Sequence, residues 1–125
     1  MQLPWRMIEM TVGKHIIADL YGVSPELIAR EESVVRLMEE VMEETGLHRV
    51  SSISKQFNPH GVTAIVLVSE SHVAIHTWPE YELVNLDIFT CSNGEKTEKA
   101  FKAFLEKFKP KYYRHMVIDR GGFNE

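Results

Sequence analysis

Side chains that can do chemistry are concentrated between residues 69 and 91 of this 125-residue chain. A serine hydroxyl can act as a nucleophile, an imidazole as a base, and a thiol or carboxyl group as a proton donor. Taken singly, such residues are more often structural, as turn serines, hydrogen-bonded histidines or small buried cysteines. Their density is what singles out this stretch, which contains Ser69, Glu70, Ser71, His72, His76, Glu80, Asp87 and Cys91.

Two familiar kinds of site fit these residues poorly. His72 and His76 share one face if they lie on a strand, but they are two pleats apart, which is too far to share one ion comfortably. The apolar and β-branched residues between them favour a strand over a helix, and no third ligand is evident, so we expect no metal. A Ser-His-Asp hydrolase is also disfavoured, because no nucleophile elbow surrounds Ser71.

The elements that position these residues follow from hydrophobic periodicity and from the glycines and prolines between them. Ser24-Pro25 predicts the start of a first helix that ends at Gly46, and Pro110 ends a second helix. Strands are predicted at 11–21, 48–57, 64–68 (as a central strand), 71–78, 83–91 and 112–119. The order β-α-β-β-β-β-α-β predicts one α+β domain, 1–125, a two-layer sandwich of a mainly antiparallel sheet with two helices on one face.

The other face of that sheet needs a different cover. In the strand 83–91, Val84, Leu86 and Ile88 share one face, whereas Asn85, Asp87, Phe89 and Cys91 share the other. A face that carries aromatic residues such as Phe89 and Phe57 beside polar ones indicates a partner chain and a site. We therefore expect a homodimer with four layers, αββα.

Composition narrows the possible functions. The chain is 44% hydrophobic and 26% charged, with 14 basic and 18 acidic residues and a net charge of −4. This balance argues against binding nucleic acid, and no apolar stretch is long enough to cross a membrane. Residues 1–10 lack the pattern of a signal peptide, and the single cysteine cannot form an internal disulfide, so we expect a cytoplasmic protein.

The motifs resemble a known family. Residues 69–81 read SESHVAIHTWPEY and residues 87–91 read DIFTC, while GKHIIADLYG at 13–22 and FNPHGVT at 57–63 extend the similarity upstream. Over residues 11–91 the chain closely resembles the S-adenosylmethionine decarboxylase proenzymes of bacteria and archaea. A pattern of this length is far more specific than a short motif.

The resemblance implies a zymogen that cleaves itself between Glu70 and Ser71. Ser71 Oγ would attack the Glu70 carbonyl to give an ester, and loss of the Ser71 Cα proton would then release the Glu70 carboxylate. Hydrolysis of the remaining dehydroalanine would leave a pyruvoyl cofactor on an α chain, 71–125, beside a β chain, 1–70. By the family pattern His76 is the proton acceptor in processing, and Thr63 provides a hydroxyl where the family usually has serine.

In the mature enzyme the resemblance assigns four further roles. The pyruvoyl group derived from Ser71 forms a Schiff base with S-adenosylmethionine, carbon dioxide leaves, and Cys91 is the proton donor to the resulting carbanion. Phe57 would stack on the adenine and Glu80 would bind the ribose hydroxyls. The product is the aminopropyl donor for spermidine biosynthesis.

Other readings remain open because the sequence departs from the family pattern at Leu83, Asn85 and Ser92. Some relatives decarboxylate arginine with the same machinery, so a pyruvoyl-dependent decarboxylase of arginine or another basic amino acid is the main alternative. A non-catalytic ligand-binding relative is a third reading. Retention of Ser71, His76 and Cys91 argues against that third reading.

Overall fold

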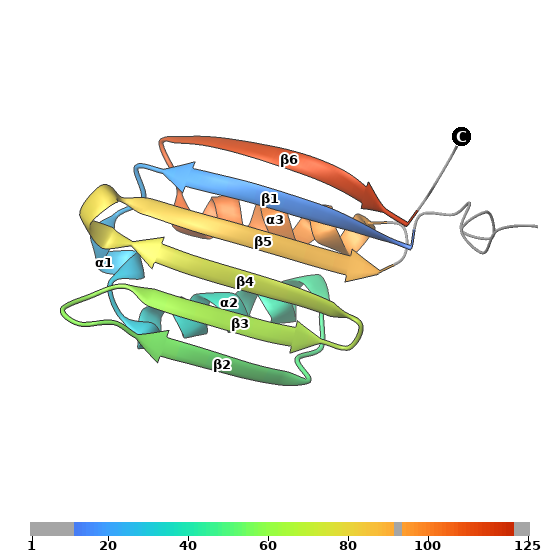
Figure 1. Cartoon of the computed structure of the whole chain (residues 1–125), viewed down its shortest axis with the longest axis horizontal. Helices are drawn as coiled ribbons and strands as arrows, with labels where there is room; N and C mark the ends of the chain where they lie inside the picture. Colours follow the sequence, from blue (N-terminus) through green and yellow to red (C-terminus); the bar gives the residue numbers. More distant parts are fainter. Residues whose placement is uncertain (1–11, 92–93, 122–125) are drawn as a thin grey trace, which may run out of the picture.

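The computed structural model describes residues 12–91 and 94–121 and consists of one sheet with helices on one of its faces (Figure 1). In chain order the elements are β1 (Gly13–Tyr21), α1 (Pro25–Ile28), α2 (Glu31–Thr45), β2 (Ser51–Gln56), β3 (Val62–Val68), β4 (Ser71–Trp78), the 3₁₀ turn η2 (Pro79–Tyr81), β5 (Leu83–Cys91), α3 (Glu95–Phe108) and β6 (Tyr112–Arg120). The strands lie in the order β2-β3-β4-β5-β1-β6, and all five neighbouring pairs are antiparallel. The predicted fold class is confirmed.

The core lies between the sheet and the two long helices. Alternate residues of each inner strand point into it, including the expected Val84, Leu86 and Ile88 of β5, all at most 1% exposed. Helices α2 and α3 pack on this face with apolar residues at helical spacing. Their fully buried side chains include Val34, Met38, Val41, Phe104 and Phe108.

The first predicted helix is interrupted. It begins at Pro25 as expected and ends before Gly46, whose φ of 74° gives it the left-handed conformation that favours glycine. Between α1 and α2, however, the carbonyl of Ile28 accepts a hydrogen bond from Thr77 Oγ1 at 2.7 Å. The carbonyl of Ala29 accepts one from the Gly61 N–H at 3.0 Å. Because neighbouring elements occupy these carbonyls, the chain forms two helices.

The prediction that residues 64–68 form a central strand is wrong. These residues belong to β3, which is next to the edge strand β2, and the central pair is β4 and β5. The apolar run predicted a strand buried on both faces, but Ile65 and Leu67 are 40% and 46% exposed. They lie on the face that the helices leave uncovered, which we call the open face.

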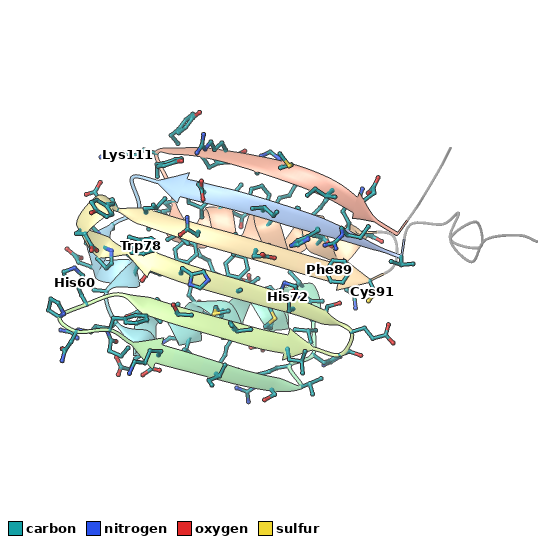
Figure 2. The ribbon with its side chains drawn as sticks, in the orientation of Figure 1. His60, His72, Trp78, Phe89, Cys91 and Lys111 are labelled. Atoms are coloured by element: carbon teal, nitrogen blue, oxygen red, sulfur yellow. The ribbon has the colours of Figure 1, made fainter. Side chains whose placement is uncertain are left out.

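The open face carries side chains from all six strands (Figure 2). It combines exposed apolar residues with polar ones, since Ile17, Ile53 and Met116 are 44%, 72% and 61% exposed. The same face holds His72 and His76 of β4 and the outward residues of β5, as the alternation predicts. Among residues 12–91 and 94–121, no helix is both long and apolar enough to span a bilayer.

Candidate active site

The predicted cleavage site lies in a tight hairpin at one end of the open face. Val68 of β3 pairs with Ser71 of β4, so only Ser69 and Glu70 connect the two strands. Ser69 has a φ of 52°, which is uncommon for a residue other than glycine. Ser71 itself is buried, with 8% of its surface exposed. The bond between Glu70 and Ser71 therefore lies at the rim of the sheet, and the serine that follows it is buried.

Cys91, the last residue of β5, contacts both residues of this bond. Its backbone N–H donates a hydrogen bond to Ser71 Oγ at 3.1 Å. Its thiol donates to the carbonyl oxygen of Glu70 at 3.3 Å and lies 3.6 Å from that residue's carboxylate. The sulfur is 3.8 Å from Ser71 Oγ. The fold thus brings Cys91 to the predicted cleavage site, 20 residues away in sequence.

An open pocket of about 610 Å³ adjoins the bond between Glu70 and Ser71. Strands β3, β4, β5 and β6 all contribute to its wall, which includes Leu67, Glu70, Ser71, His72, Phe89 and Arg120. Figure 2 shows His72, Phe89 and Cys91 close to the same end of the sheet.

The other predicted residues lie at the opposite end of β4. Thr63 on β3 faces His76 on β4, and Thr63 Oγ1 is 3.0 Å from His76 Nδ1. Both line a pocket of about 310 Å³ together with Phe57 and Glu80. Phe57 lies in the loop after β2 and is 46% exposed, so it presents a free ring face.

Glu80 lies in η2, where its carboxylate is 3.4 Å from His60 Nε2. This contact occupies one oxygen of Glu80, and Glu80 lines the same pocket as Phe57.

The predicted site residues therefore fall into two separate groups within one chain. Five residues along a strand span roughly 16 Å, so His76 cannot contact Ser71 of the same chain. The first group contains Glu70, Ser71 and Cys91, and the second contains Phe57, Thr63, His76 and Glu80.

A row of four side chains was not anticipated from the sequence. His72 Nε2 is 3.1 Å from Asp87 Oδ1, and His15 Nε2 is 2.5 Å from the same oxygen. Arg120 Nη1 lies 2.9 Å from His15 Nδ1. The row crosses β4, β5, β1 and β6 and ends beside Ser71. Alternation predicts that each of these residues faces outward, but only the strand order and register bring them into contact.

His15, His72 and Asp87 are also close enough to be considered as metal ligands, since their ligand atoms lie within 4.8 Å of one another. The guanidinium of Arg120 can only donate, so His15 Nδ1 accepts and the ring proton is on Nε2. His15 Nε2 is then a donor to Asp87 and presents no lone pair to an ion.

A second row at the other end explains one departure from the family pattern. Asn85 accepts a hydrogen bond from Trp78 Nε1 at 2.7 Å and donates one to Asp19 at 2.8 Å. Asp19 in turn pairs with Arg114 of β6 at 3.6 Å. Asn85 thereby fixes Trp78, which lines the same pocket as Phe57. Leu83 is paired with Trp78 in the ladder, and Ser92 lies outside the described residues.

Fold and site together define an α+β protein in which a buried serine and a thiol lie in contact at the rim of an open antiparallel sheet. The chain belongs to the S-adenosylmethionine decarboxylase family, whose model matches residues 14–121. It is 68% identical over 112 residues to the S-adenosylmethionine decarboxylase proenzyme of Archaeoglobus fulgidus, covering 90% of this chain and 100% of that protein. The proenzyme of Hydrogenobaculum sp. is 45% identical, covering 89% and 83% of the two chains.

Solved structures agree with this assignment. The adenosylmethionine decarboxylase of Aquifex aeolicus superposes with a TM-score of 0.87 at 39% identity and covers 92% of this chain and 95% of its own. A Trypanosoma brucei AdoMetDC monomer matches at a TM-score of 0.63 and 16% identity, covering 83% of this chain and 45% of that one. At that identity the second similarity concerns the fold alone.

Proposed function

We propose that this protein is an S-adenosylmethionine decarboxylase that generates its own pyruvoyl group by cleavage between Glu70 and Ser71. The observation that carries the proposal is the contact of Cys91 with both sides of this bond, at 3.1 Å to Ser71 Oγ and 3.3 Å to the Glu70 carbonyl oxygen. The similarity to chains named as decarboxylase proenzymes supports it.

The residues at the cleavage site fit this chemistry. The Cys91 N–H holds Ser71 Oγ beside the hairpin, and the thiol hydrogen bond polarises the carbonyl that Oγ attacks. A pyruvoyl group at position 71 withdraws electrons from an amino acid bound through its amine, so that carbon dioxide can leave. Cys91 is then placed to donate a proton at the same position. Because its thiol must stay reduced for this role, we infer a cytoplasmic location.

Processing also requires a base, and the candidate base His76 is too far from Ser71 of the same chain to act on it. We infer that His76 and Thr63 act on Ser71 of a second copy. A two-fold axis between the two open faces, perpendicular to β4 and midway between residues 71 and 76, reverses the partner strand. This operation brings each His76 over the partner's Ser71 and covers the exposed Ile17, Ile65 and Leu67.

A mixed dimer tests this arrangement. Ser71→Ala removes the nucleophile and His76→Ala removes the base, so neither variant alone should cleave. In a co-expressed mixture, an intact His76 from the Ser71→Ala chain faces an intact Ser71 on the other chain. In the mixed dimer we expect only the His76→Ala chain to be cut, and the intact masses of the fragments identify which chain was cut. No cleavage in a mixed dimer purified with two different tags would contradict the shared site.

Phe57 and Glu80 favour a nucleoside substrate. A half-exposed aromatic ring can stack on a purine, and a carboxylate can accept hydrogen bonds from a ribose diol. Arginine has neither group, although its guanidinium could pair with Glu80. Release of carbon dioxide from S-adenosylmethionine, arginine and ornithine, measured in parallel, decides the substrate. A kcat/KM that favours arginine would overturn the nucleoside assignment but not the proposed pyruvoyl chemistry.

A further inference from the structure

The row formed by His72, Asp87, His15 and Arg120 has no role in the reaction described so far. It runs across the open face from β6 to β4 and ends at the residue that follows Ser71. Three of its side chains pack around the ring of Phe89. The ring of Phe89 lies 5.6 Å from that of His15 and 5.9 Å from that of His72, with the Arg120 guanidinium 5.8 Å from its centre. The row is therefore packed as well as hydrogen-bonded.

We propose that these four residues are positioning residues that hold the start of the α chain after self-cleavage and so keep residue 71 beside Cys91. This inference rests on the proposed function. Before cleavage, residue 71 is held from both sides, because the two-residue turn ties it to β3. After cleavage that connection is gone, and the first residues of a strand fray readily when they lose it.

His72 is the first residue of the α chain whose two peptide bonds both survive cleavage. It is paired with Leu67 on β3 and with Phe89 on β5, and its side chain adds a bond to Asp87. Asp87 lies on the same face of β5 as Cys91, four residues earlier. The His72–Asp87 bond therefore joins the cut end of β4 to the strand that carries Cys91.

Asp87 is suited to this task because its own position is fixed. Both histidines share its Oδ1, and the side chain of His15 is only 12% exposed. Arg120 donates to His15 Nδ1 and so keeps the proton on the nitrogen that faces Asp87. A carboxylate held in this way returns His72 to one position rather than several.

Hydrogen exchange in two backgrounds tests the proposal. Asp87→Asn is compared with Asp119→Asn, a matched change at a residue that is 61% exposed and pairs only with Lys14 among the described residues. Each is made in the self-cleaving chain and in the uncleaved Ser71→Ala chain, and exchange of the amides of residues 72–75 is followed by mass spectrometry. We expect Asp87→Asn to speed their exchange at least tenfold in the cleaved protein and less than twofold in the uncleaved one.

A purely structural role for Asp87 would speed exchange equally in both backgrounds, and that result would overturn the proposal. So would an Asp87→Asn chain that fails to cleave, because the row would then be needed before the tether is lost. A wild-type chain that stays uncleaved would overturn the proposed function and this inference together.

A double variant shows whether Asp87 acts through His72. We expect Asp87→Asn and His72→Gln each to lower kcat of the cleaved enzyme at least tenfold with KM changed less than threefold. The double variant should be no slower than the worse single variant, because both changes remove one bond. Multiplying effects would show that the two residues act independently and would contradict the proposal. His72→Gln repeats the exchange measurement if Asp87→Asn does not fold.

Discussion

Cys91 contacts Ser71 through its backbone and Glu70 through its thiol, at 3.1 Å and 3.3 Å. One residue thus offers two donors, one on each side of the bond that we propose is cut. Only the thiol is removed by substitution, so the two contributions can be separated by experiment.

Cys91→Ala should still permit some cleavage, slowed by loss of the thiol hydrogen bond to the Glu70 carbonyl, and yet turn over poorly. The N–H that holds Ser71 Oγ remains, whereas the proton donor for catalysis is lost, which typically costs on the order of a hundredfold or more. Intact mass measures cleavage, and release of carbon dioxide measures turnover. Cys91→Ser is the matched variant, because it keeps a weak donor of similar size. Wild-type turnover in a cleaved Cys91→Ala protein would remove the thiol from the mechanism.

Thr63→Val should slow self-cleavage at least tenfold. Valine keeps the shape of threonine but removes the hydroxyl that lies 3.0 Å from His76 Nδ1. Thr63→Ser restores that hydroxyl and should cleave at least as fast as the wild type. The time course of fragment formation after synthesis measures both. Equal rates for the valine and serine variants would show that the hydroxyl is dispensable.

Phe57→Ala should raise KM for S-adenosylmethionine about fivefold or more, since aromatic stacking is worth about 1 kcal/mol beyond area burial. The side chain is half-exposed and makes no contact with Ser71, so cleavage should proceed normally. Phe57→Tyr keeps the ring and serves as the control. Steady-state kinetics on fully cleaved protein gives KM, and an unchanged KM would show that Phe57 does not stack on the adenine.

Lys107 should make stability fall at high pH. Its ammonium donates to Glu44 at 3.2 Å and lies 3.5 Å from Glu40, which joins α3 to α2. The hydrogen bond to Glu44, with the charges of both carboxylates, raises the pKa of Lys107 above its usual 10.5. A raised pKa stabilises the fold below the unfolded value of about 10.4, and this contribution is lost as pH rises through the folded pKa.

Thermal unfolding of the Ser71→Ala chain from pH 8 to pH 11.5 measures this effect. Lys107→Met should lower Tm at pH 8, and the difference from the parent should shrink above about pH 10.5. Lys99→Met, at an exposed pair within α3, should change Tm little at any pH. A difference that is constant with pH would assign the effect of Lys107 to packing of its side chain.

Much of this molecule follows from local pattern, because alternation and helical spacing are properties of neighbouring residues. They predict the inner face of β5, the helix end at Gly46 and the common face of His72 and His76. The break after Ile28 depends on Thr77, 49 residues away, and the exposure of Ile65 depends on the strand order. Neither can be read from a local segment, and the same is true of the contact between His15 and Asp87, 72 residues apart.

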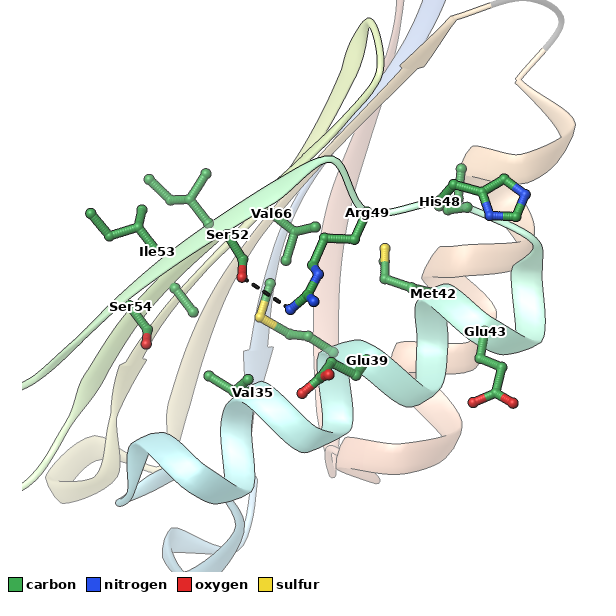
Figure 3. A pocket seen from close by; sticks show the side chains of 14 residues that line it. Val35, Glu39, Met42, Glu43, His48, Arg49, Ser52, Ile53, Ser54 and Val66 are labelled. Carbon is green, nitrogen blue, oxygen red and sulfur yellow. Dashed lines mark hydrogen bonds between the residues drawn. The ribbon is translucent and has the colours of Figure 1, made fainter.

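A pocket beside the helices also depends on residues that are distant in sequence. It lies between α2 and β2, has a volume of about 310 Å³ and is lined by Met42, Glu39 and Ser54 among others (Figure 3). Arg49 reaches into it and donates to Ser52 at 3.4 Å. Near the start of α2 the helix and the edge strand do meet, because Ser54 Oγ donates a hydrogen bond to the carboxylate of Glu31. No predicted site residue contributes to this pocket.

The strands of the two fragments alternate across the sheet. Residues before the proposed cut supply β1, β2 and β3, and residues after it supply β4, β5 and β6, yet β1 lies between β5 and β6. Three ladders would therefore cross between the fragments, namely β3–β4, β5–β1 and β1–β6. Folding must precede cutting, because neither piece alone contains neighbours for all its strands. Once cut and unfolded, the two fragments of a protomer would have to meet again in solution before they fold, so cleavage would make the folding of even a single protomer depend on protein concentration.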